Sequence, residues 1–144
     1  MVTAERIVAT LGGPRALKRK HVTLEDLQAQ LRTGLPYSAL EAVASGFEIG
    51  TADLVAVLRV PPRTLARRKR EKRLRADESD RLYRLGRIAS LAEEILGSRA
   101  KATRWLHEPN RALANAIPLR QLDTEVGARQ VEDLLLRIAH GVYS

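Results

Sequence analysis

Two consecutive prolines, Pro61 and Pro62, impose the sharpest local constraint on the fold of this chain. Proline fixes its own backbone and suits the first turn of a helix, so the pair predicts that one helix ends before residue 61 and another begins there. The preceding segment TADLVAVLR, residues 51–59, suits a short apolar helix. A helix, a turn of about three residues through Arg59 and Val60, and a second helix give the spacing of a helix-turn-helix unit.

The second of these helices runs into a basic block, RTLARRKREKRLR, at residues 63–75. The block holds eight basic residues and one acidic residue, a net charge of +7, whereas the whole chain is formally +8. Because the rest of the chain is nearly neutral, the block is expected to face a polyanion such as nucleic acid. A solvated helix face or a charged linker is the alternative.

Helical spacing predicts which side chains of the block are free to bind. Leu65 is predicted to face inward, against Leu54, Val55 and Leu58 of the first helix. The residues predicted to face outward are Arg63, Thr64, Arg67, Arg68 and Arg70. One α-helix fits the major groove of DNA, where Arg pairs with guanine or clamps phosphates. Arg63 and Thr64, near the helix start, are predicted to read bases, and phosphate contacts are predicted further along, at Arg70, Lys72, Arg73 and Arg75.

Capping and terminating residues divide the rest of the chain into further helices. The predicted starts are Thr3, Thr23, Pro36, Thr51, Asp77, Ser98 and Thr124, and the predicted ends are Gly12–Pro14, Gly34, Gly97, Pro109 and Gly141. With one Phe, one Trp and three Tyr, the core must be mainly aliphatic, which favours helices over sheets. The fold class is therefore predicted to be all-α, with a helix-turn-helix module over residues 1–75 and a C-terminal helical module over 76–144.

No catalytic or metal-binding set emerges from the sequence. The chain has no Cys, and His21, His107 and His140 are far apart without partners at metal-ligand spacing. A Gly-rich phosphate loop and a GxSxG motif are both missing. We therefore expect a binding protein, not an enzyme, with no catalytic residue, no metal and no cofactor. No apolar run approaches the roughly 20 residues of a membrane span, and no secretory signal is recognised, so a cytoplasmic location is expected.

Several segments, read in order, carry a family resemblance. They are PPRTLARR, RLRADESDRLYRLGRI, AKATRWLHEPNRAL and IPLRQLDTEVGARQVEDLLLRIAHGVYS. With these motifs the chain, from about residue 34 to its end, resembles antitoxins of the Xre/MbcA/ParS family. The resemblance implies an Xre-type helix-turn-helix that binds the promoter of its own operon, and a C-terminal domain that neutralises a toxin. It also implies that the partner is a RES-domain toxin that consumes NAD, and that the antitoxin is a homodimer.

The resemblance also assigns residues. It places the DNA-reading helix at Arg63, Thr64, Leu65, Arg67 and Arg68, and the toxin-facing element at Arg137, His140, Gly141, Val142 and Tyr143. The end of the chain is thereby implied to approach the NAD cleft of the toxin; alternatively, RIAHG only caps and packs the last helix. One departure concerns NRALANAIP, where the family often has a Gly-rich turn. Asn115 tolerates left-handed backbone angles, so the turn is expected to persist.

Two other functional interpretations remain open at this point. The chain could be a stand-alone repressor whose C-terminal helices only dimerise. It could also be a non-specific binder of RNA or of a membrane surface that uses the basic block as a charge patch, although that interpretation leaves the helix-turn-helix spacing unexplained.

Overall fold

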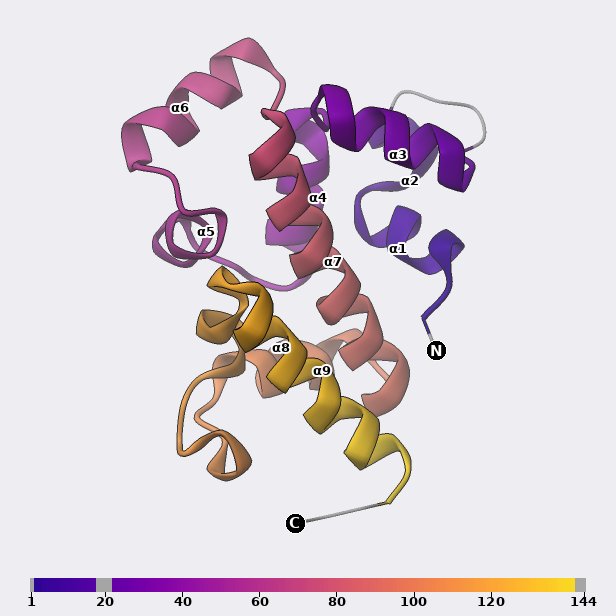
Figure 1. Cartoon of the computed structure of the whole chain (residues 1–144), viewed down its shortest axis with the longest axis vertical. Helices are drawn as coiled ribbons and strands as arrows, with labels where there is room; N and C mark the ends of the chain where they lie inside the picture. The colour runs from indigo at the N-terminus through magenta and orange to yellow at the C-terminus, as the bar shows by residue number, and fades with distance from the viewer. Residues whose placement is uncertain (1, 18–21, 142–144) are drawn as a thin grey trace.

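A computed structural model describes residues 2–17 and 22–141, which fold into helices joined by short connections (Figure 1). The α-helices are α1 (Ala4–Thr10), α2 (Gly13–Leu17), α3 (Leu24–Thr33), α4 (Tyr37–Gly46), α5 (Thr51–Leu58), α6 (Pro62–Glu71), α7 (Ala76–Leu96), α8 (Arg99–His107) and α9 (Glu125–Ala139). Two 3-10 helices, η1 (Arg111–Leu113) and η2 (Pro118–Asp123), lie between α8 and α9. The described residues contain isolated β-bridges but no strand, so the predicted all-α class is confirmed.

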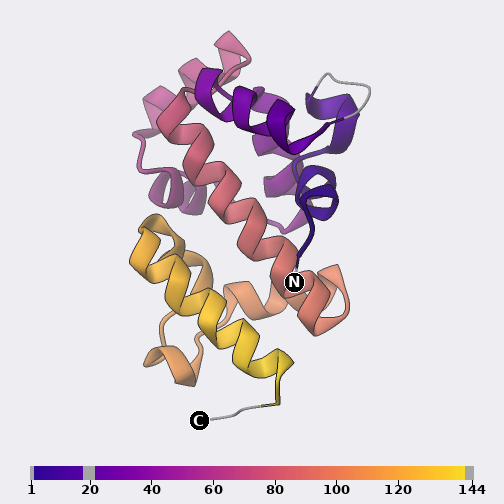
Figure 2. The same cartoon turned by 45° about the vertical axis from the view of Figure 1, so that its right-hand side comes forward.

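Helix α7 is the centre of the fold. It packs against α1, α3 and α5, which precede it in the chain, and against α8 and α9, which follow it. Figure 2 shows α3 lying across one end of α7 and α9 beside the other end. Its buried residues include Leu82, Leu85, Ile88 and Ala89, which recur at helical spacing and face the core. The proposed division between residues 75 and 76 stays a prediction, since α7 contacts helices from both sides of it.

Small residues let α1 cross close to α7. A Cβ added at Gly86 would lie 3.3 Å from the Leu11 side chain, so a larger residue there would push α1 outward. Beside it, the Ser90 hydroxyl lies 2.6 Å from the Thr10 hydroxyl and donates to the Gly86 carbonyl at 2.7 Å. Since Ser90 and Thr10 are both buried, these hydrogen bonds satisfy polar groups that burial would otherwise penalise.

Most of the predicted helix boundaries are confirmed, because they depend on contacts within three or four residues. The hydroxyls of Thr3, Thr23, Ser98 and Thr124 accept backbone N–H groups at the starts of α1, α3, α8 and α9. At Thr23 the Asp26 carboxylate also accepts the Thr23 N–H at 3.1 Å, which completes the capping box. Helix α2, directly after Gly12, was not predicted; the Gly13–Pro14 pair that should end one helix also begins this short one.

Two predicted N-caps are wrong by one or two positions. Helix α5 has Gly50 as its N-cap, with Thr51 already helical. Helix α7 begins at Ala76 after an N-cap at Arg75, and Asp77 lies inside its first turn. The reason is Glu78, whose carboxylate accepts the backbone N–H of Arg75 at 2.9 Å and so fixes the helix start two residues before Asp77.

Candidate nucleic-acid interface and C-terminal surface

Helices α5 and α6 form the predicted helix-turn-helix unit. Arg59 ends α5 in a left-handed conformation (φ 58°, ψ 46°), Val60 is buried in the turn, and Pro61 and Pro62 start α6. The Val60 N–H donates to the Val55 carbonyl at 3.2 Å, which closes the end of α5. Figure 1 shows α6 at one end of the molecule, projecting beyond α5, where a long partner could reach it.

The outward face of α6 carries a row of arginines. Arg63, Arg67 and Arg70 are exposed and recur every three or four residues, so they lie within a sector of about 60° on one side of the helix. Leu65 is buried on the opposite side, against the rest of the fold, and Thr64 lies half-buried between the two faces. No acidic residue occupies the first turn of α6. The row is therefore a cationic surface of the width of one helix.

Arg68 is not part of that row, and its predicted outward orientation is wrong. Its side chain is 5% exposed and makes a bidentate ion pair with Glu78. The Nε donates to Oε1 at 2.8 Å and the Nη2 donates to Oε2 at 3.0 Å. Arg68 lies three residues after Leu65 and therefore shares its inward side. Hydrogen bonding to Glu78 raises the pKa of the Arg68 guanidinium and outweighs the opposite effect of burial, so the guanidinium stays charged.

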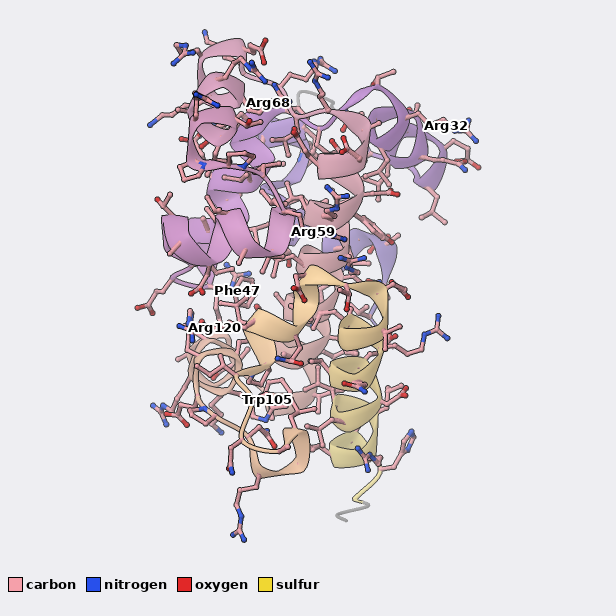
Figure 3. The ribbon with its side chains drawn as sticks, turned by 60° about the vertical axis from the view of Figure 1, so that its left-hand side comes forward. Arg32, Phe47, Arg59, Arg68, Trp105 and Arg120 are labelled. Carbon is pink, nitrogen blue, oxygen red and sulfur yellow. The ribbon has the colours of Figure 1, made fainter. Side chains whose placement is uncertain are left out.

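Glu78 is the residue of this interface that the sequence did not reveal. Its carboxylate receives the Arg68 guanidinium and the Arg75 N–H together, and its side chain is 4% exposed. Through these contacts the first turn of α7 holds α6 in place (Figure 3 labels Arg68). Glu71, the second carboxylate near Arg68, lies 3.2 Å from it but is 53% exposed. The inner partner of Arg68 is therefore Glu78.

Hydrogen bonds to residues 34–37 hold the segment after α6 in place. Lys72 ends the helix in a left-handed conformation, and its carbonyl accepts the Tyr37 N–H at 3.1 Å. The Leu74 N–H donates to the Leu35 carbonyl at 2.9 Å, and the Arg73 guanidinium donates to the Gly34 carbonyl at 3.0 Å. Lys72, Arg73 and Arg75 stay exposed, as their predicted phosphate contacts require, but Arg73 also has this part in the fold.

The C-terminal surface is formed by α9 and the turn before η2. Helix α9 buries Ala128, Val131 and Leu135. Its other side borders a groove of about 390 Å³, whose lining includes Ala114 of the turn together with Asp133 and Arg137 of α9. Arg137 thus lines a groove, and its contact with a toxin stays a prediction.

The remaining predicted residues of this surface lie at the end of α9. His140 is the exposed C-cap, and Gly141 follows in a left-handed conformation (φ 70°). This is the C-terminal signal that glycine gives. Val142 and Tyr143 lie outside the described residues.

The turn over residues 110–116 keeps a tight conformation without glycine. The Asn110 side chain accepts the Ala112 N–H at 2.9 Å, and Ala114 and Asn115 both have left-handed backbones, with φ of 54° and 67°. The expectation that the turn persists is confirmed. The strain falls on Ala114, because an alanine in this region costs about 1–2 kcal/mol.

Replacing Ala114 by glycine should relieve that strain. We expect Ala114→Gly to raise the free energy of unfolding by about 0.5–1 kcal/mol, because the removed strain exceeds the extra entropy of glycine in the unfolded chain. Chemical denaturation measures the change. The matched control is Ala112→Gly, at a residue without a positive φ, which should lower stability. A loss of stability in both variants would contradict the strained-turn interpretation.

Gly127 permits the close approach of η2 to the first turn of α9. A Cβ at this position would lie 1.9 Å from the Gln121 carbonyl oxygen and 3.1 Å from the Thr124 hydroxyl. We expect Gly127→Ala to cost about 3 kcal/mol of unfolding free energy, since backbone must move to admit the methyl group. Gly50→Ala, where no atom lies within 4 Å of the added Cβ, should cost less than about 1 kcal/mol in the same denaturation experiment.

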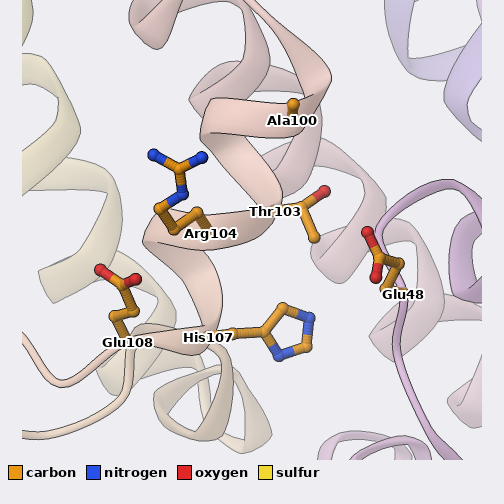
Figure 4. Close-up of a pocket in the computed structure, with 6 residues that line it drawn as sticks. All are labelled: Glu48, Ala100, Thr103, Arg104, His107 and Glu108. Atoms are coloured by element: carbon orange, nitrogen blue, oxygen red, sulfur yellow. The ribbon is translucent and has the colours of Figure 1, made fainter.

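A second groove, of about 480 Å³, lies between α8 and the connection from α4 to α5 (Figure 4). It is bordered by Glu48, Thr103 and His107, and the His107 ring nitrogen Nε2 lies 2.9 Å from the Phe47 carbonyl. This contact ties α8 to the end of α4. Within residues 2–17 and 22–141, no three His, Asp or Glu side chains converge to hold a metal, and no helix is long and apolar enough to cross a membrane. His21 lies outside the described residues.

Comparison with known proteins gives both halves of the chain a match. Residues 26–87 match the antitoxin Xre-like helix-turn-helix domain, and residues 91–141 match the antitoxin Xre/MbcA/ParS C-terminal toxin-binding domain. The first range holds α5 and α6, and the second holds α8, α9 and the groove at Arg137.

Three curated relatives carry the name Antitoxin Xre. The protein from Pseudomonas putida is 43% identical over 83 residues, which are 57% of this chain and 52% of that protein. The protein from Photorhabdus laumondii is 34% identical over 120 residues, 82% of this chain and 81% of that protein. The protein from Yersinia enterocolitica is 30% identical over 116 residues, 79% and 78% of the two chains. The chain thus spans about half of the first relative and about four fifths of the other two, and it belongs to the Xre antitoxin family, with a helix-turn-helix domain followed by a toxin-binding domain.

Proposed function

We propose that this protein neutralises a RES-domain toxin that consumes NAD, and that it represses its own operon by binding promoter DNA as a homodimer. The observation that carries the DNA part is the row of Arg63, Arg67 and Arg70 on a helix whose inner side is fixed by the Arg68–Glu78 pair. A helix that binds in a DNA groove must be held rigidly while its cationic side chains stay exposed, and α6 meets both conditions.

The residues proposed to contact DNA fall into two groups. Arg63 and Thr64, at the start of α6, are the base-reading candidates. The phosphate-contacting candidates are Arg67, Arg70, Lys72, Arg73 and Arg75. Arg68 is left out of both groups because its guanidinium is committed to Glu78.

The toxin-binding part of the proposal rests on the surface around Arg137. Arg137 lines a groove that lies wholly within the segment matching a toxin-binding domain, and it shares that groove with Asp133. His140 follows at the exposed end of the same helix. A cation at a groove near the end of the chain suits contact with the cleft of an enzyme whose substrate, NAD, carries phosphates.

Arg137 can be tested against another arginine of the same helix. We expect Arg137→Ala to weaken the complex with the toxin about 30-fold or more, as loss of an interface hot spot does. Arg129→Ala is the control, because Arg129 is 70% exposed and lies 3.4 Å from Glu125 on the surface. Titration calorimetry with the purified toxin measures both. Equal affinity of the two variants would remove Arg137 from the interface.

The whole proposal is tested with the product of the adjacent gene. The full chain and a chain lacking residues 137–144 are each co-expressed with that product, followed by co-purification and measurement of cellular NAD. The proposal predicts a stable complex and preserved NAD for the full chain only. If no complex forms but the chain still binds its promoter, the stand-alone repressor becomes the better function.

A further inference from the structure

A groove between α3 and the first two turns of α7 has no assigned partner. It measures about 410 Å³ and is lined by Gln28, Leu31, Arg32, Ala76, Asp77 and Asp80. Leu24, one α3 turn before Gln28 on the same side of the helix, is 62% exposed. Among the described residues only Leu24 and Val126 are large hydrophobic side chains with such exposure. The groove thus combines charged side chains of both signs with an exposed apolar side chain beside it.

Charge disfavours DNA as the occupant of this groove, and position in the chain disfavours the toxin. Asp77 and Asp80 would repel DNA phosphates, although they follow the basic block directly in the chain. The groove lies within residues 26–87, which match the helix-turn-helix domain, and outside residues 91–141, which match the toxin-binding domain. The remaining partner of the proposed function is a second copy of this chain.

The same groove is complementary to itself. Arg32 comes from α3 and Asp80 from α7, and neither forms an ion pair with a residue that the structure describes. Asp77 is paired with Arg81 at 3.5 Å, yet its side chain is still 65% exposed. In a twofold dimer each contact occurs twice, so a surface that carries both an unpaired cation and an unpaired anion can satisfy both with a second copy of itself.

We propose that two copies of this chain associate through this α3–α7 groove, with Arg32 opposite Asp80 of the partner subunit and Leu24 buried at the edge of the contact. This inference rests on the homodimer of the proposed function and assigns its surface. Figure 1 shows α3 and α6 at the same end of the molecule, and the first turn of α7 anchors α6 through Glu78. Association here would leave the arginine row of each α6 uncovered, since that row faces away from α7.

Charge exchange tests the surface without removing any core residue. The dimer dissociation constant of the full-length chain is measured by sedimentation equilibrium for the natural sequence, Arg32→Asp, Asp80→Arg and the double variant. Each single variant should raise the constant about tenfold or more, because like charges meet at two symmetric places, and the double variant should restore it to within about threefold. Leu24→Asp should also dissociate the dimer, whereas Val126→Asp on α9 should leave it intact. Thermal melting of every variant verifies the fold.

The other outcomes separate this inference from the function on which it rests. A dimer that none of the α3–α7 variants weakens would overturn the groove as its surface and leave the homodimer standing. A chain that is monomeric at all concentrations would overturn both. Toxin binding and NAD preservation, measured separately, would not be affected by either result.

Discussion

Glu78→Ala is expected to lower the free energy of unfolding by about 3–5 kcal/mol, because it leaves the buried Arg68 guanidinium without its main partner. The Arg68 side chain is 5% exposed, so the charge cannot reach water unless α6 moves. We therefore also expect weaker promoter binding, since movement of α6 displaces the row formed by Arg63, Arg67 and Arg70. Urea denaturation gives the first quantity and fluorescence anisotropy with promoter DNA gives the second.

The matched control for this variant is Glu71→Ala. Glu71 also lies 3.2 Å from Arg68, but its side chain is 53% exposed, so its loss should cost less than about 1 kcal/mol. If both variants lose the same small amount of unfolding free energy, Arg68 reaches solvent easily and Glu78 does not hold α6. If Glu78→Ala is unstable but binds DNA as tightly as the natural chain at a temperature where both are folded, the pair serves stability alone.

The local part of this interface could be predicted from the sequence. The Pro61–Pro62 pair fixes the start of α6, and the three- and four-residue spacing of Arg63, Arg67 and Arg70 places them on one side of it. These features depend only on backbone preferences and helix geometry within a few residues. The helix-turn-helix spacing followed from the same information.

The burial of Arg68 depends on a residue distant in the chain as well as on helix geometry. Its charge suggested an exposed residue, but its spacing from Leu65 turns it inward, and burial is tolerated only because Glu78 lies opposite. Glu78 is ten residues further along, beyond the reversal that begins at Lys72 in a left-handed conformation. The misplaced N-cap at Asp77 has the same origin, since the capping carboxylate is the one recruited by Arg68.

The C-terminal surface was predicted only in part. That Thr124 caps α9 and that Gly141 lies beyond its end follow from local patterns. The groove at Arg137 depends on the turn at residues 110–116 lying against α9, which is a contact between segments about twenty residues apart. No periodicity in the sequence encodes such a contact, and only the family resemblance pointed to Arg137.

The combined replacement of Arg63, Arg67 and Arg70 by alanine is expected to weaken promoter binding about 1,000-fold or more. Each arginine that contacts a base or phosphate contributes about 1–3 kcal/mol, and three such contacts act on one helix face. The slope of log affinity against log salt concentration should fall by up to about three, one for each phosphate contact that is lost. Because the three side chains are exposed, the unfolding free energy should change little.

The control removes the same charge elsewhere. Arg104, Arg111 and Arg129 are exposed in the C-terminal half, and their combined replacement by alanine gives a chain of equal net charge. Fluorescence anisotropy with a duplex from upstream of the coding sequence, and with a shuffled duplex of the same composition, separates the explanations. If only the α6 variant loses much of its affinity, and most of all for the natural duplex, the arginine row recognises the DNA sequence. Equal losses for both variants on both duplexes would mean that net charge alone attracts the nucleic acid, which is the behaviour of a non-specific binder.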